Sequence, residues 1–158
     1  MKMKIVLIIA IILALVLIFT LIFHQRQDDN ILMEIVFWPR GGGDRGSPVY
    51  HFVVKDDGTF ISYYGLSRSD SNRNRTSSVI RVIEERKEIS LSDKEFSHIS
   101  ELVDRIVSGD SEGGAFSSAL AMFIYDGNIY ENSTAWSGAL HEMIQMFFEL
   151  APLSSHSH

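Results

Sequence analysis

The chain has 158 residues, with 14 lysines and arginines against 20 aspartates and glutamates, a net charge of −6 and no cysteine. This composition excludes disulfides, thiol chemistry and lipid attachment through a cysteine. The acidic balance is also poorly suited to nucleic acid and to anionic lipid, so we expect no nucleic-acid partner. The 129 residues from Asn30 to His158 are enough for one domain with a modest core.

An apolar segment, residues 5–23, follows the opening MKMK. Sixteen of its 19 residues are Ile, Leu, Val or Phe, and Thr20 is the one polar residue. A helix of this length is about 28 Å long, close to the hydrocarbon thickness of a bilayer. The segment is longer than the apolar part of a cleaved secretory signal, and bulky residues follow it. The sequence therefore predicts an uncleaved transmembrane helix that binds the lipid bilayer, with a cleaved signal as the alternative.

The flanking charges predict the orientation of this anchor. Lys2 and Lys4 precede it, whereas Arg26 is the one arginine or lysine that follows it closely. Positive charge favours the cytoplasmic side. We therefore expect residues 1–4 in the cytoplasm, a linker over 24–30 that reaches about 23 Å when extended, an extracytoplasmic domain over 31–152 and a flexible tail over 153–158.

Strand signals dominate the first half of the domain. Residues 31–38, ILMEIVFW, are short and rich in β-branched and aromatic side chains, which indicates a strand. Residues 49–65 contain two apolar runs around Lys55-Asp56-Asp57-Gly58, which is typical of a hairpin. Residues 66–78 are almost entirely polar and predict a loop. Residues 79–91 predict another strand, with its charges as a possible interruption.

Two helices and a second hairpin are predicted in the other half. Ser92 and Glu95 form a capping-box pattern, and apolar residues at 3-and-4 spacing follow up to Gly109. Residues 118–132 predict a hairpin that turns at Asp126-Gly127. A last helix is expected from Ser137 to Pro152. The order predicts an α+β domain: a mostly antiparallel sheet of five or six strands with both helices on one face.

Ser111 lies in Gly109-Asp110-Ser111-Glu112-Gly113, which matches the G-x-S-x-G pattern of a nucleophile elbow. The elbow needs a strand before the serine and a helix after it, because this turn lifts the hydroxyl above the sheet. Here a helix precedes the motif and a strand follows it. The pattern favours an ordinary loop, and a membrane-tethered hydrolase using Ser111, with His141 as a base, is kept as an alternative.

Other motifs also favour structural roles. The glycines of residues 41–46 match a dinucleotide fingerprint, but a strand follows them instead of a helix, so no cofactor is predicted. No two histidines have the spacing of a helical metal motif, so no metal site is predicted. His51 alternates with Val49 and Val53 on a strand and is the one histidine expected to be partly buried.

Two strands carry apolar residues on both faces, although only two helices are available to cover the sheet. The face opposite the helices is therefore expected to contact a protein partner or a second copy of the chain, with cover by the arginine-containing loop or the glycine loop of the same chain as the alternative. The candidate members of this face are Val49, His51, Val53, Phe123 and Tyr125. The sequence thus predicts a membrane-anchored, non-enzymatic binding module, with a structural subunit of a membrane complex as a further alternative.

Overall fold

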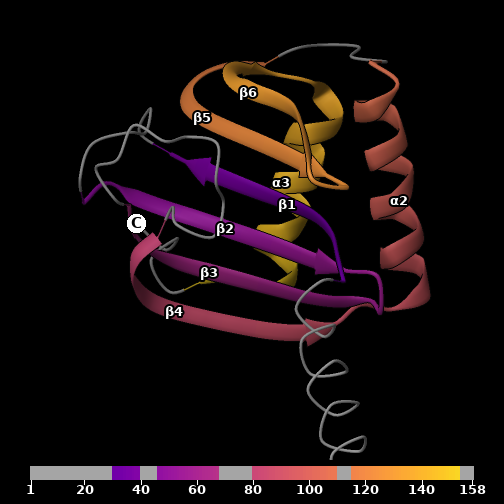
Figure 1. Ribbon diagram of the computed structural model, residues 1–158, viewed down its shortest axis with the longest axis horizontal. Coiled ribbons are helices and arrows are strands. Elements are labelled where there is room, and N and C mark those ends of the chain that lie inside the picture. The colour runs from indigo at the N-terminus through magenta and orange to yellow at the C-terminus, as the bar shows by residue number, and fades with distance from the viewer. Residues whose placement is uncertain (1–29, 40–45, 68–79, 110–114, 154–158) are drawn as a thin grey trace, which may run out of the picture. The chain divides into compact units, whose positions relative to one another are not determined.

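A six-stranded antiparallel sheet forms the centre of the computed structural model, which describes residues 30–39, 46–67, 80–109 and 115–153 (Figure 1). The strands are β1 (Ile31–Trp38), β2 (Pro48–Lys55), β3 (Thr59–Ser67), β4 (Ile80–Ser90), β5 (Ala115–Tyr125) and β6 (Asn128–Trp136). The helices among these residues are α2 (Asp93–Val107) and α3 (Gly138–Leu150). The expected α+β class and antiparallel sheet are confirmed.

The strand order across the sheet is β4-β3-β2-β1-β5-β6. The first four strands form a meander, and β5 returns after α2 to pair with the free side of β1. The first strand in the sequence therefore lies inside the sheet, between β2 and β5. The edges are β4 and β6.

Both predicted hairpins are present, and their turns form as the sequence indicates. In the β2–β3 turn the Gly58 amide donates to the Lys55 carbonyl over 3.1 Å. In the β5–β6 turn both Asp126 and Gly127 have positive φ, 46° and 72°. Aspartate followed by glycine tolerates this backbone, and its twist matches that of the two strands.

The strands of both hairpins are longer than the sequence predicted, whereas β1 has the predicted bounds and β4 is one residue shorter at each end. Strand β3 continues two residues further, to Ser67, and β5 and β6 together extend from Ala115 to Trp136. Strand β4 is continuous through its charged residues 84–88, where an interruption was considered. Charged side chains suit an edge strand, because they remain in water and discourage pairing with other chains.

The caps of both helices follow the predicted chemistry. The Ser92 hydroxyl accepts from the Glu95 amide, and the Ser92 amide donates to the Glu95 carboxylate over 2.7 Å, which completes the capping box of α2. The Ser137 hydroxyl accepts from the Leu140 amide over 3.1 Å and caps α3. Each cap supplies a partner to amides that the first turn of a helix leaves unpaired.

Both helices pack on one face of the sheet, as expected, and Figure 1 shows them on the same side. Their buried residues share one core with the sheet. That core includes, among others, Met33, Ile35, Phe52, Phe60, Ile99, Leu102, Leu140, Met143 and Phe147. Leu153 is also buried in it.

A second, smaller apolar cluster occupies the opposite face of the sheet. It is formed by Val36, Trp38, Val49, Leu120, Met122 and Ile124, with Ile80 packed against it. All six are buried in the single chain. The apolar character predicted for this face is present, but these six side chains are not open to a partner.

Candidate functional site

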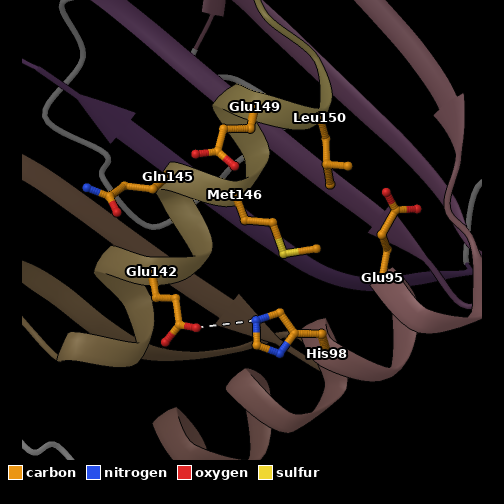
Figure 2. Close-up of a pocket in the computed structure, with 7 residues that line it drawn as sticks. All are labelled: Glu95, His98, Glu142, Gln145, Met146, Glu149 and Leu150. Atoms are coloured by element: carbon orange, nitrogen blue, oxygen red, sulfur yellow. Dashed lines mark ion pairs between the residues drawn. The ribbon is translucent and has the colours of Figure 1, made fainter.

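The candidate site is a groove between α2 and α3 with a volume of about 470 Å³. Figure 2 shows Met146 and Leu150 of α3 on the side that faces α2, whereas Gln145 and Glu149 extend toward the other side of α3. Helix α2 contributes Glu95 and His98, and α3 contributes the other lining residues. These are Glu142, Gln145, Met146, Glu149 and Leu150.

The groove exists because both helices direct their apolar faces into the same core. Residues such as Leu102 and Met143 are fully buried there, so the polar residues beside them are left to line the space between the helices. Met146 and Leu150 lie at the boundary, because both are partly buried and pack against the core. They give the groove apolar surface among polar side chains.

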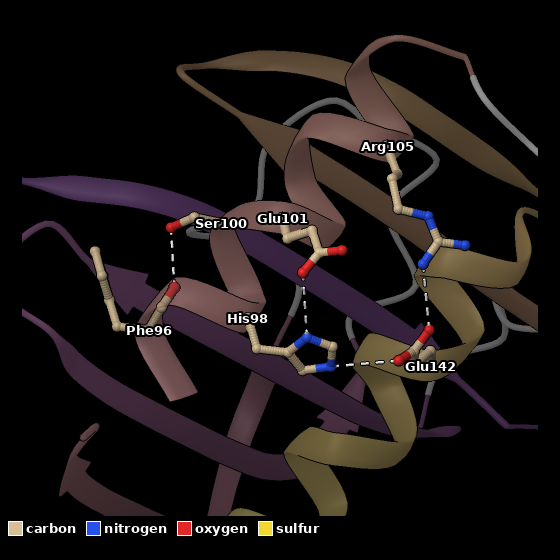
Figure 3. Close-up of polar contacts among 6 residues, drawn as sticks. All are labelled: Phe96, His98, Ser100, Glu101, Arg105 and Glu142. Atoms are coloured by element: carbon tan, nitrogen blue, oxygen red, sulfur yellow. Dashed lines mark hydrogen bonds and ion pairs between the residues drawn. The ribbon is translucent and has the colours of Figure 1, made fainter. Parts of the chain in front are cut away.

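Glu142 joins the two helices at one end of the groove (Figure 3). Its carboxylate lies 3.3 Å from Nε2 of His98 and 3.5 Å from Nη1 of Arg105. The other imidazole nitrogen of His98 lies 3.9 Å from Glu101. All these groups are at least partly exposed, so each pair contributes at most about 1 kcal/mol to stability. Their main effect is to balance the charge of Glu142.

Glu95 remains ionised at neutral pH. Hydrogen bonds from the side chain and the backbone of Ser92 stabilise its carboxylate and lower its pKa. A carboxylate whose pKa is lower in the folded state stabilises the fold above its unfolded pKa. That contribution is lost as the pH falls through the folded pKa. The recorded hydrogen-bond donors to this carboxylate are the uncharged amide and hydroxyl of Ser92, so Glu95 keeps its formal negative charge in the first turn of α2.

The groove is acidic as a whole. It contains three carboxylates, and the imidazole and guanidinium groups near it both contact Glu142. Its lining includes no serine, threonine or cysteine, so it offers no hydroxyl or thiol nucleophile. Within the described ranges no group of three or more His, Cys, Asp or Glu residues could hold a metal ion. This chemistry suits the binding of a cationic group.

The five residues predicted from sequence do not share one face. In the register of the sheet, Ile35 pairs with both Phe52 and Phe123, whereas Val36 pairs with His51 and Met122. Phe123 is therefore in the helix-covered core, and Tyr125 packs against that core. Val49, His51 and Val53 lie on the other face. Leu120, Met122 and Ile124 are the β5 residues that accompany them.

Val49, His51 and Val53 are already buried, with exposed fractions of 0, 9 and 5%. His51 is the one buried histidine among the described residues, and its Nε2 lies 2.7 Å from the carboxylate of Glu34 on β1. Its ring also stacks on Tyr63 of β3. The sequence reasoning missed Glu34, although a glutamate within the apolar run ILMEIVFW indicates a buried polar partner.

The remaining sequence motifs lie mostly outside the described residues. Ser111, Asp110 and Glu112 of the hydrolase alternative lie there, as do most of the glycine-rich segment 41–46 and most of the predicted polar loop 66–78. His141 is exposed on α3, with Nε2 3.0 Å from the side-chain amide of Gln145. In the part of the chain that is described, no helix has the length and apolar character needed to cross a bilayer, and residues 5–23 are not in that part.

Comparison with known proteins gives no relative: no protein-family model, no curated protein and no solved structure matches the chain.

Proposed function

We propose that the chain is a single-pass, membrane-anchored and non-enzymatic binding module whose domain lies outside the cytoplasm. The observation that carries this proposal is the 19-residue apolar segment, which only seven residues separate from the start of the sheet. A helix of this composition is favoured in a bilayer, and the lysines before it favour a cytoplasmic N-terminus. The domain is then held close to the membrane surface.

The groove between α2 and α3 supports a binding role. Glu95 and Glu149 supply negative charge, while Met146 and Leu150 supply apolar surface beside them. A lysine side chain combines an aliphatic stem with a terminal ammonium group, so it matches both features. We therefore assign the groove to a partner that presents a lysine-like cationic side chain.

The membrane anchor predicts that the full chain sediments with membranes and stays there after a high-salt wash. External protease should digest the domain in intact cells from which any outer barrier has been removed. Salt removes proteins held by surface charge but leaves a spanning helix in place. Sedimentation followed by immunoblotting measures both results. Complete protection of the domain would show the opposite orientation. A soluble product that starts near residue 24 would show that residues 5–23 are a cleaved signal and not an anchor.

The groove predicts binding of a lysine probe, the Nα-acetyl methylamide of lysine, to the full chain in detergent micelles. We expect its addition to shift the methyl resonance of Met146 in the groove and to leave that of the buried Met143 unchanged. The norleucine analogue has the same stem without the charge and should cause a much smaller shift. Methyl-labelled methionine makes both resonances observable by NMR.

Two glutamine substitutions provide the control for this titration. Glu149→Gln removes one groove carboxylate and should weaken binding of the lysine probe several-fold. Glu84→Gln removes an exposed carboxylate on β4 that does not line the groove and should leave the affinity nearly unchanged. Equal effects of the two variants, or equal shifts with lysine and norleucine, would refute the groove as a specific cation site.

A further inference from the structure

Three exposed apolar side chains lie at one end of the sheet. Six large hydrophobic residues among those described are exposed: Ile31, Val82, Ile83, Val107, Ile129 and Tyr130. Ile31 is the first residue of β1, and Ile129 and Tyr130 lie near the start of β6. Three of the six therefore lie near the point where the chain from the apolar segment joins the sheet.

The register of the sheet places these residues at a common end. Ile31 pairs with Lys55, the last residue of β2, and Met33 pairs with Tyr125, the last residue of β5. The Asp126 amide also donates to the Leu32 carbonyl over 3.4 Å. We call this the β1-start end, defined by Ile31 and the turns at residues 56–58 and 126–127. Figure 1 shows the start of β1 and both turns on the same side.

The length of the linker limits the distance between this end and a membrane anchor. Residues 24–30 span at most about 23 Å when fully extended, so Ile31 cannot lie farther than this from the end of the apolar segment. This step rests on the proposed membrane anchor. The opposite end of the sheet, where Val82 and Ile83 are exposed, has no such restriction.

The chemistry of the β1-start end fits the interface of a zwitterionic bilayer. Tyrosine is enriched at the level of the lipid headgroups, because its ring is apolar and its hydroxyl is polar. Asp56, Asp57 and Asp126 occupy the two turns and are exposed. Hydrogen bonds from the side chain and the backbone amide of Thr59, the latter over 2.8 Å, lower the pKa of Asp57, so its carboxylate is charged at neutral pH. These carboxylates disfavour anionic lipid.

We propose that the domain rests on the bilayer through its β1-start end, with Ile31, Ile129 and Tyr130 in the headgroup region of zwitterionic lipid. The anchor and this contact together then fix the orientation of the domain relative to the membrane. In this arrangement the domain has a defined side toward the membrane, and its remaining surface faces the aqueous phase.

A polarity-sensitive label on a single cysteine tests this contact, and the absence of native cysteines makes each label specific. The full chain is reconstituted into phosphatidylcholine vesicles with the NBD fluorophore on Ile129→Cys, on Ile31→Cys or on Val82→Cys. Val82 is the matched control for Ile129, because the two residues are 45 and 43% exposed but lie at opposite ends of the sheet. Near-ultraviolet circular dichroism checks that each variant is folded.

We expect the labels at 129 and 31 to emit at shorter wavelength in vesicles than the same fluorophore does in aqueous buffer. Brominated lipid should quench both labels. The label at 82 should emit at the wavelength typical of an aqueous environment. Replacing a third of the lipid with phosphatidylglycerol should not strengthen the quenching of the labels at 129 and 31. Retention in the vesicle pellet after a salt wash is measured on the same samples. Loss of the chain from the pellet refutes the anchor itself. Retention with equal signals at 129 and 82 refutes the contact alone.

Discussion

Replacing Phe147 by alanine is expected to lower the free energy of unfolding by about 4 kcal/mol, because it removes a large side chain from the centre of the core. Phe147 is fully buried on α3. Its ring centroid lies 4.7 Å from that of Phe60 on β3 and 5.4 Å from that of Phe52 on β2. The substitution leaves a cavity that rigid strands cannot close, so it weakens the attachment of α3 to two strands at once.

Urea unfolding of the full chain in detergent, followed by tryptophan fluorescence, measures this loss. The matched control is Val107→Ala at the end of α2. Val107 is 37% exposed, and the expected change is within about 0.5 kcal/mol. A loss below about 1 kcal/mol for Phe147→Ala would mean that α3 does not pack on β2 and β3 as described.

Gly65→Ala is expected to cost about 3 kcal/mol, although it adds a single methyl group. Gly65 lies on β3 at a register shift opposite β4. A Cβ atom there would lie 2.0 Å from the carbonyl oxygen of Val82 and 2.8 Å from Cγ2 of Ile80. Backbone atoms cannot rotate away, so β3 and β4 must separate at this point.

Hydrogen exchange locates the damage, and urea unfolding gives its size. Amides of β4 should exchange faster in Gly65→Ala, while those of β5 should change little. Gly58→Ala in the β2–β3 turn is the control, because a Cβ atom there meets open space and the cost is limited to its positive φ, about 1 kcal/mol. Equal stabilities for the two variants would contradict the close approach of β3 and β4.

Local signals in the sequence predicted the fold class and the order of its elements. Both Asp-Gly turns and the Ser92 capping box depend on interactions within a few residues, so the sequence alone reveals them. Strand lengths were less predictable, because they depend on pairing with a distant neighbour. Ser67 belongs to β3 since its partner on β4 is Ile80, although the sequence around it is typical of a loop.

The candidate site was harder to predict because it is made by long-range contacts. Alternation along β2 and β5 separates each strand into two sets of side chains. It does not show which set of one strand shares a face with which set of the other. Only the common pairing with β1 shows that Phe123 and Phe52 are on the same face of the sheet. In the groove, His98 and Glu142 are far apart in sequence and meet because α2 and α3 share one core.

The inner position of β1 has a mechanical consequence for a tethered domain. Tension on the N-terminal segment is delivered to Ile31, the first residue of a strand that is hydrogen-bonded to β2 on one side and to β5 on the other. An edge strand can be peeled away by breaking one ladder, whereas extraction of β1 breaks two and divides the sheet into β2–β4 and β5–β6. Under the proposed membrane anchor, tension would therefore act on a strand that is held by two ladders of hydrogen bonds instead of one.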